Sequence, residues 1–279
     1  MYTEVKKFSR KVMKKSLHYT FWKSEKAKRL LLTKKYNAIE RSQEVSENTT
    51  QYSELYKRLS AGDVKRIKLI GDSITAGVGV LSYYENKKSK VIFDNKKGEV
   101  YYEPHHTILS WSNYFRHYVN KNFPSVDLIN CGIGGKSAKW VNTNKDYLIN
   151  NNEDIVFVML GTNDRWDSSS LDEYKTNLEE LLDNISNNSK LMYVLCPPPT
   201  LNDNRFSFGM DEINKVVKAI CEDQCYNYIS FYDHLMEYSK NNNIELDKMF
   251  ETTGSHPVQK GYDEMWRYLG RELTLITES

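Results

Sequence analysis

The sequence predicts an α/β protein: a three-layer α/β/α sandwich in which helices cover both faces of a five-stranded parallel sheet of flavodoxin-like order. Two observations indicate this fold class. From residue 66 onward, short and almost wholly apolar runs alternate with longer segments of helical periodicity. Strands that are apolar on both faces are typical of parallel sheets buried between two helical layers. The five runs are residues 67–70, 126–129, 155–160, 191–195 and 228–231.

Helical segments lie between and after these runs. The clearest has apolar residues at helical spacing from Leu171 to Ile185, and a shorter one covers about residues 111–118. The last helix is predicted over residues 258–276. An insertion at residues 82–109 contains the stretches KVIF and EVYY on either side of DNKKG, which predicts a small hairpin over the sheet edge.

The N-terminal part differs in composition from the rest of the chain. Residues 1–36 are predicted to be helical, and a polar stretch from residue 44 predicts a linker or a helix start. The chain therefore divides into a basic helical extension, residues 1–64, and a main domain, residues 65–279.

The charge of the chain is unevenly distributed. Residues 1–40 contain twelve Lys or Arg and three Asp or Glu, a balance of +9, so the remaining 239 residues carry −7 of the total of +2. The simpler interpretation is a solvated helical face packed on the body. The alternative is a surface that meets something acidic: a membrane face, a polyanionic polymer or a partner protein.

Composition excludes several classes of protein. The chain has 279 residues, 39% apolar and 27% charged, which is typical of a soluble globular protein with one sizeable core. No apolar run approaches the ~20 residues of a membrane span, and the N-terminus lacks the apolar core of a signal peptide. We expect a cytoplasmic location, or a peripheral one at a membrane surface, with no nucleic-acid partner. The four cysteines are expected to be reduced, and Cys221 and Cys225 lack the partners that a metal site needs.

Four loops rich in Gly, Asn and Pro follow predicted strands. In a parallel α/β sheet, such loops gather at the carboxyl ends of the strands, where ligands bind. The loops have the sequences GDSIT, NCGIGGKSA, GTNDRWD and CPPPTLNDN. The first contains Ser73 at a strand-to-helix turn, whose backbone N–H groups suit a developing oxyanion.

A serine nucleophile requires a base and oxyanion donors, and the sequence offers both. Asn163 in GTND could direct its amide at the oxyanion, and the glycines of GIGG allow a backbone N–H to approach the same point. His256 lies in GSHPVQKGY, just before the last predicted helix.

These blocks resemble those of the SGNH, or GDSL, hydrolases. GDSIT, NCGIGG, GTND and SHP occur in the family's order, over about residues 66–276. The resemblance implies that Ser73 is the nucleophile and His256 the general base. It also implies an oxyanion hole formed by the backbone N–H groups of Ser73 and Gly135 and the side chain of Asn163. It requires no cofactor and no metal, and it gives Asp72 and Asp164 structural roles.

One position departs from the family pattern. The family has an acid three residues before the histidine, and here that position is Thr253. Because loss of the orienting acid in a serine triad lowers the rate by up to ~10⁴-fold, another group must hold the imidazole or the activity is reduced. We expect a backbone carbonyl near residues 251–254 to accept the Nδ1 proton, giving a Ser-His dyad. Glu251 and Asp247 are alternatives at a spacing that differs from the family's.

The function expected from these residues is that of a serine esterase, a carboxylic ester hydrolase, acting on a small-molecule or glycan ester through an acyl-enzyme intermediate. The resemblance implies an O-acetyl ester on a carbohydrate, which Trp140 and Trp166 could help to bind by stacking. An O-acyltransferase would use the same residues, and a non-catalytic interaction module of the same fold would explain Thr253.

A nucleotide-binding protein is a further alternative. NCGIGGKS nearly spells a phosphate-binding P-loop, because Gly135, Lys136 and Ser137 fit the end of that motif. Asn130, however, occupies the position of its first glycine.

Overall fold

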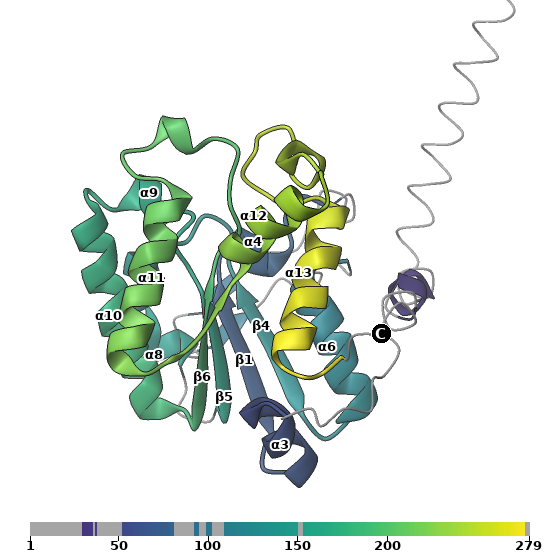
Figure 1. Ribbon diagram of the computed structural model, residues 1–279. Helices are drawn as coiled ribbons and strands as arrows, with labels where there is room; N and C mark the ends of the chain where they lie inside the picture. Colours follow the sequence, from purple (N-terminus) through teal and green to yellow (C-terminus); the bar gives the residue numbers. More distant parts are fainter. Residues whose placement is uncertain are drawn as a thin grey trace, which may run out of the picture.

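The computed structural model describes residues 30–35, 37, 52–80, 92–94, 99–101, 109–149 and 153–276. Its centre is a five-stranded sheet in the order β4-β1-β5-β6-β7, with all neighbours parallel (Figure 1). This arrangement confirms the predicted flavodoxin-like order, since the first strand in the chain lies between the second and the third. The strands are β1 (Arg66–Gly71), β4 (Asp127–Gly132), β5 (Ile155–Met159), β6 (Leu191–Cys196) and β7 (Asn227–Ser230).

Helices cover both faces of the sheet, as predicted. Two apolar cores result, because alternate side chains of each strand point to opposite faces: Leu69 of β1 lies in one core and Ile70 in the other. The first core is covered by α3 (Glu54–Ala61), α6 (Trp111–Asn122), α12 (Phe231–Asn241) and α13 (Gln259–Glu272). The second is covered by α7 (Ala138–Thr143), α8 (Lys145–Leu148), α10 (Leu171–Asn188) and α11 (Met210–Gln224).

Helix α3 lies before the predicted domain boundary at residue 65 and yet packs on the sheet. Leu55 and Leu59 are buried in the first core, and the Leu55 N–H donates to the Tyr193 hydroxyl at 3.3 Å. Ser53 caps α3 and also donates to the Leu273 carbonyl, at 2.6 Å. The packed body therefore begins before residue 65.

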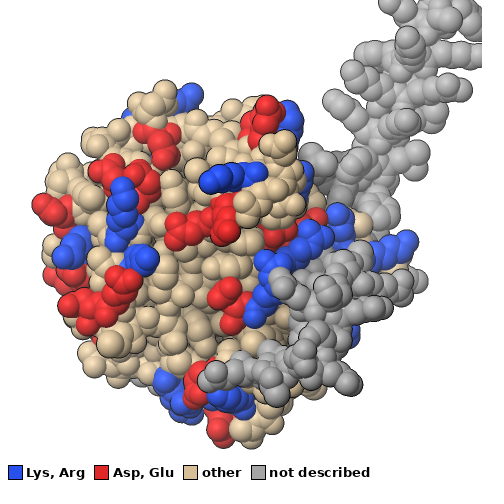
Figure 2. Space-filling model, viewed as in Figure 1, with Lys and Arg blue, Asp and Glu red and all other residues tan. Residues whose placement is uncertain are grey.

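The described part of the N-terminal segment is helical at residues 30–35 and 37. Leu31 and Leu32 pack against the first core, and Lys35 forms an ion pair with Asp263 at 3.3 Å. The rest of the helix predicted over residues 1–36 lies outside the described residues. On the face of the body shown in Figure 2, basic and acidic side chains are interspersed rather than gathered by sign.

The insertion contains the predicted hairpin. Strands β2 (Ile92–Asp94) and β3 (Glu99–Tyr101) pair antiparallel as a separate two-stranded sheet, and β3 lies near α8. His105 and His106, in the same insertion, lie outside the described residues.

Short helical turns follow the carboxyl ends of the strands or precede the last helices. They are α4 (Ser73–Ala76), α9 (Asp164–Asp167) and the 3₁₀ turns η1 (Asp203–Arg205) and η2 (Leu246–Lys248). Among the described segments, none forms a helix of the length and apolar character needed to cross a membrane.

Candidate active site

Ser73 is the first residue of α4, directly beyond the end of β1. Asp72 is the N-cap of this turn, and its carboxylate accepts the Ile74 N–H at 2.8 Å. The turn packs closely on β4, since a Cβ on Gly132 would lie 2.4 Å from the Ala76 nitrogen. The glycines and small residues of this region therefore let the serine-bearing turn sit against the sheet edge.

His256 lies against Ser73, as the family resemblance implies. The Nε2 atom of His256 is 2.9 Å from the Ser73 Oγ atom. Gly79 makes this approach possible: its φ is +106°, and a Cβ there would lie 2.3 Å from the Pro257 carbonyl oxygen and 3.0 Å from the His256 Cβ. The segment after α4 and the histidine loop are thus in direct contact.

The histidine loop is a short hairpin. Val258 N–H donates to the Met249 carbonyl at 2.8 Å, and Glu251 N–H donates to the His256 carbonyl at 2.9 Å. Residues that face each other across such a pair direct their side chains to the same side. Glu251 and His256 are one such pair, and the Glu251 Oε1 atom is 2.6 Å from the His256 Nδ1 atom.

This contact corrects the expected dyad. We predicted that a backbone carbonyl near residues 251–254 would accept the Nδ1 proton, but a carboxylate occupies that position. The reason is the hairpin: pairing across its two strands brings position 251, rather than the tip position 253, opposite the imidazole. Thr253 supports the carboxylate, because its hydroxyl donates to Glu251 Oε1 at 2.7 Å.

These contacts determine the tautomer of His256. An ionised carboxylate can only accept hydrogen bonds, so the Nδ1 atom carries the proton toward Glu251. The neutral ring then presents the Nε2 lone pair to the Ser73 hydroxyl. In this arrangement the imidazole can act as a base toward Ser73.

Asn163 contacts the residues that follow Gly135 and precede Ser73 in the chain. The Asn163 Nδ2 atom is 3.0 Å from the Lys136 carbonyl oxygen and 3.3 Å from Asp72 Oδ2. These bonds join the third and second sequence blocks to the serine turn, and one of them must yield before the amide can donate to an oxyanion. Gly135 has a φ of +74°, which favours glycine, and open space where a Cβ would be.

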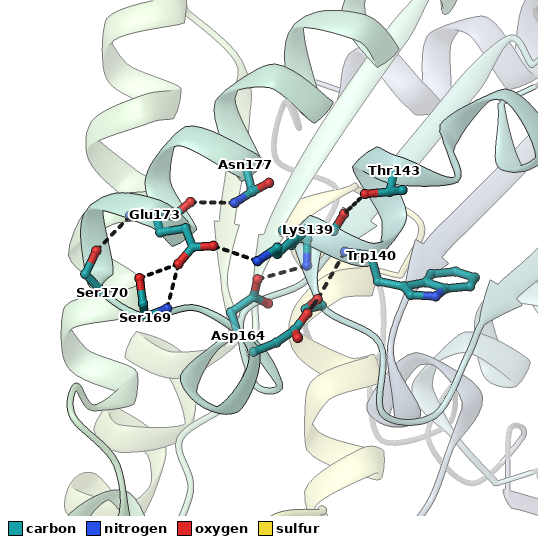
Figure 3. A network of polar contacts seen from close by, with 11 residues as sticks. Lys139, Trp140, Thr143, Asp164, Ser169, Ser170, Glu173 and Asn177 are labelled. Atoms are coloured by element: carbon teal, nitrogen blue, oxygen red, sulfur yellow. Dashed lines mark hydrogen bonds and ion pairs between the residues drawn. The ribbon is translucent and has the colours of Figure 1, made fainter.

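Asp72 and Asp164 are buried carboxyl groups beneath these loops. Burial raises the pKa of Asp72 to about 6, against the opposing effect of the Ile74 N–H and, when the imidazole is protonated, of His256. Burial also raises the pKa of Asp164 to about 7, and the charges of Asp72 and Asp167 add to this effect. Asp164 accepts the Ala138 N–H at 2.9 Å and so ties α9 to α7 (Figure 3).

The side chains of the P-loop-like segment have protein partners. Lys136 Nζ lies over the Trp140 ring, 4.5 Å from its centroid, while the Ser137 hydroxyl donates to the Asp167 carboxylate. The Asn130 amide donates to the Thr75 carbonyl at 3.0 Å. Within the described ranges, no group of three or more His, Cys, Asp or Glu side chains is arranged to hold a metal ion.

Two features of the site have weak signals in the sequence. Glu251 is expected only as an alternative, because its spacing from His256 differs from the family's; the hairpin is indicated by TTGSHP, where Gly254 adopts a φ of +75°. Arg165 is the second such feature. Its side chain is 1% exposed and pairs with Asp203 at 2.6 Å, and nothing in its local sequence distinguishes it from a surface arginine.

Comparison with known proteins identifies the family and the fold. The model of the GDSL-like lipase/acylhydrolase family matches residues 69–264, more than half of the chain. No curated protein matches the sequence. Among solved structures, the chain is similar to Axe2, an acetylxylan esterase from Geobacillus stearothermophilus, with 20% identity and a TM-score of 0.58 over 77% of this chain and 97% of that one. It is also similar to LAE5, an α/β hydrolase enzyme from the metagenome of Lake Arreo, Spain, with 17% identity and a TM-score of 0.59 over the same shares.

Structural likeness at such low identity shows a shared fold, whereas the family model matches the sequence itself across all four blocks. The protein therefore belongs to the GDSL-like lipase/acylhydrolase family, and so to the carboxylic ester hydrolases.

Proposed function

We propose that this protein is a serine esterase in which Ser73, His256 and Glu251 form a catalytic triad. The observation that carries the proposal is the continuous line of contacts from Ser73 Oγ to His256 Nε2, 2.9 Å, and from His256 Nδ1 to Glu251 Oε1, 2.6 Å. These are the distances expected between a nucleophile, its base and the group that orients the base. A non-catalytic interaction module would not need this alignment.

In the acylation step, Ser73 Oγ forms a bond to the ester carbonyl carbon while its proton moves to His256 Nε2. The imidazole then carries a positive charge, which the adjacent Glu251 carboxylate stabilises. When the ester C–O bond breaks, the same proton passes to the leaving alcohol oxygen and the acyl group remains on Ser73. A water molecule then attacks the acyl group on Ser73 by the same steps, which release the carboxylic acid and restore the serine hydroxyl.

Each attack places negative charge on the carbonyl oxygen, which needs nearby donors. The backbone N–H groups of Ser73 and Gly135 and the Asn163 amide are the proposed donors. Asp72 orients the Asn163 amide through the 3.3 Å contact, so its role is to hold the donor rather than to take part in proton transfer.

We further propose that the ester is an O-acetyl group on a carbohydrate. Trp166 supports a sugar as the alcohol part, because its side chain is 74% exposed on α9, three residues after Asn163. Its indole ring meets the Phe206 ring edge-on at 4.8 Å, which holds it as a flat surface beside the site. One structural neighbour also acts on acetylated sugars: Axe2 is described as an acetylxylan esterase and as an acetyl-xylooligosaccharide esterase.

Axe2 also helps to explain the role of Glu251. Catalytic mutants of that enzyme replace an aspartate and, three residues later, a histidine. In the present chain the residue three positions before His256 is Thr253, which has no carboxylate. Glu251 is therefore the proposed replacement for the acid of that pair.

Hydrolysis of p-nitrophenyl acetate tests the chemistry. We expect the wild type to release p-nitrophenol and Ser73→Ala to lose this activity by at least ~10³-fold. Absence of turnover in the wild type, or equal turnover in Ser73→Ala, would refute the esterase proposal. An O-acyltransferase would use the same residues, and adding a sugar alcohol distinguishes it: transfer gives the acetylated sugar in place of free acetate.

A further inference from the structure

Arg165 is a buried cation two residues after Asn163. Its guanidinium lies 4.0 Å from the Phe206 ring centroid, and its Nε atom donates to the Thr162 carbonyl at 3.2 Å. Burying a charge is costly unless its partners are well placed. Helix α9, which carries Arg165, is a single turn next to Asn163. The partners of Arg165 therefore show which segment of the chain the buried guanidinium holds in place.

Three of these partners, Thr200, Asp203 and Phe206, lie in segment 200–206, which leads from β6 toward α11 above the carboxyl edge of the sheet (Figure 1). Arg165 donates to the Thr200 hydroxyl at 3.0 Å and to Asp203 Oδ1 at 2.6 Å. The other oxygen of Asp203 accepts the Met210 N–H at 2.9 Å, at the start of α11. Arg165 therefore fixes both ends of the short stretch between Thr200 and Asp203.

The two residues of that stretch hold the tip of the histidine hairpin. Leu201 N–H donates to the Gly254 carbonyl at 2.8 Å. The Asn202 amide lies 2.9 Å from the Ser255 hydroxyl and 3.2 Å from the Thr253 carbonyl oxygen. The contact is close as well as polar, since a Cβ on Gly254 would lie 2.7 Å from the Leu201 Cβ.

The hairpin tip determines how Glu251 faces His256. Gly254 N–H donates to the Glu251 carbonyl at 2.8 Å, and Thr253 donates to the Glu251 carboxylate. Movement of the tip would thus change the contact between the carboxylate and the imidazole.

We propose that Arg165 is a positioning residue that acts through segment 200–206 to hold Glu251 against His256. The proposal rests on the esterase function proposed above. Residues 163–165 would then serve two parts of the site: Asn163 supplies the proposed oxyanion donor, and Arg165 anchors the hairpin that carries the base.

Two variants test the proposal, together with a matched control. Arg165→Lys keeps a charge beside Asp203 but loses the Nε donor to Thr162 and the planar guanidinium over the Phe206 ring, so we expect it to hold segment 200–206 less firmly. Asn202→Ala removes only the side-chain tether to the tip. Asp154→Ala is the control, because Asp154 likewise ties separate segments together through side-chain hydrogen bonds, here to the N–H groups of Lys65 and Arg66, but at the opposite end of the sheet.

With p-nitrophenyl acetate, we expect kcat to fall about 10- to 100-fold in Arg165→Lys and Asn202→Ala, with KM nearly unchanged, because misplacement of catalytic groups by about 1 Å has effects of this size. In a Glu251→Gln background, Asn202→Ala should lower kcat by less than about twofold, since the pair it positions is already broken. Asp154→Ala should leave kcat unchanged.

A second measurement does not depend on activity. The proton between His256 Nδ1 and Glu251 should give a low-field ¹H resonance, present in wild type and Asp154→Ala and lost or shifted in Arg165→Lys and Asn202→Ala. Unchanged kcat and an unchanged resonance in folded Asn202→Ala would overturn the positioning role, as would equal effects of Asn202→Ala with and without Glu251. An inactive wild type that keeps the resonance pattern would refute the esterase proposal and leave the positioning role standing.

Discussion

Glu251 and His256 face each other across a short hairpin, and the carboxylate of the first is 2.6 Å from the Nδ1 atom of the second. Their side chains are 16% and 21% exposed, so the pair is partly shielded from water. In such surroundings a carboxylate can stabilise the charge that the imidazole acquires during attack.

Replacement of Glu251 by Gln should therefore lower kcat by about 10²- to 10⁴-fold with little change in KM, since the charge is needed mainly in the transition state. Steady-state kinetics with p-nitrophenyl acetate measures this. Thr253→Val is the matched control, because it removes one donor to Glu251 and keeps the carboxylate. Its kcat should fall by about tenfold or less. A Glu251→Gln enzyme with wild-type kcat would contradict the triad.

Position 253 offers a rescue experiment. The Thr253 hydroxyl is 2.7 Å from Glu251 Oε1, so a carboxylate at position 253 would begin close to the imidazole. We expect Glu251→Gln/Thr253→Asp to recover at least about tenfold of the kcat lost in Glu251→Gln, whereas Glu251→Gln/Thr253→Asn, which has no charge, should not. Equal kcat values in the two double variants would show that a carboxylate at position 253 does not replace the one at position 251.

Asn163→Ala should lower kcat by about 10²- to 10³-fold, the usual effect of removing one oxyanion donor. The same substitution removes the bonds to Lys136 and Asp72, so a thermal melt must accompany the kinetics. Asn142→Ala is a suitable control, because Asn142 also donates through its amide, to Glu180 at 2.7 Å, but on the exposed side of α7. If Asn163→Ala keeps kcat, the amide is not an oxyanion donor.

The buried carboxyl group of Asp164 should make stability depend on pH with an unusual sign. Its pKa of about 7 lies above the unfolded value of 3.8, so the folded state holds a proton that the unfolded state loses as pH rises between these values. Its contribution to the free energy of unfolding is fully present below about pH 4 and is lost as pH rises through 7. The loss is at most about 4 kcal/mol for a shift of this size.

Asp164→Asn should therefore gain stability relative to wild type as pH rises from 4 to 8, as measured by urea unfolding. Asp154→Asn should show no such gain between pH 4 and 8, and should approach wild-type stability only as pH falls below about 4. Although burial acts to raise it, the pKa of Asp154 is lowered by the Lys190 ammonium and the N–H groups of Lys65 and Arg66, so its contribution is lost as pH falls. Parallel pH curves for Asp164→Asn and wild type would show that Asp164 is not a buried acid of raised pKa.

Trp166 should affect the sugar part of the substrate and not the chemistry. We expect Trp166→Ala to raise KM for an acetylated xylo-oligosaccharide by about tenfold and to leave kcat/KM for p-nitrophenyl acetate unchanged, because stacking is lost while the triad remains. Tyr52→Ala is a matched control, since that side chain is also exposed, at 48%, but stacks on Tyr56 of α3. Equal KM values for wild type and Trp166→Ala would remove the support for a sugar platform.

Much of the fold could be predicted because the strands have a simple signal. The run at residues 155–160 is apolar throughout, and a short strand covered on both faces by helices buries all of its side chains. The start of the body was harder to place. Leu55 and Leu59 lie one turn apart in a polar segment, and only their packing under the sheet shows that they belong to the core.

The residues of the site that stand in short family blocks could be named from the sequence, and those that depend on how the chain pairs could not. Ser73 is marked by its strand-to-helix turn, whereas the contact of Glu251 with His256 depends on hairpin register, which spacing alone does not reveal. Arg165 depends on a partner 38 residues away, Asp203, so its burial has no local signal.

The pairing of the histidine hairpin has a consequence for how enzymes of this family are recognised. Positions 251 and 253 lie side by side on the hairpin, because Thr253 Oγ1 and His256 Nδ1 both contact Glu251 Oε1, so we expect that an acid at either position could orient the imidazole. A sequence pattern that demands an acid three residues before the histidine would classify such a chain as inactive. A chain with acids at both positions could change from an acid at 253 to an acid at 251, or the reverse, without ever lacking a carboxylate beside the histidine.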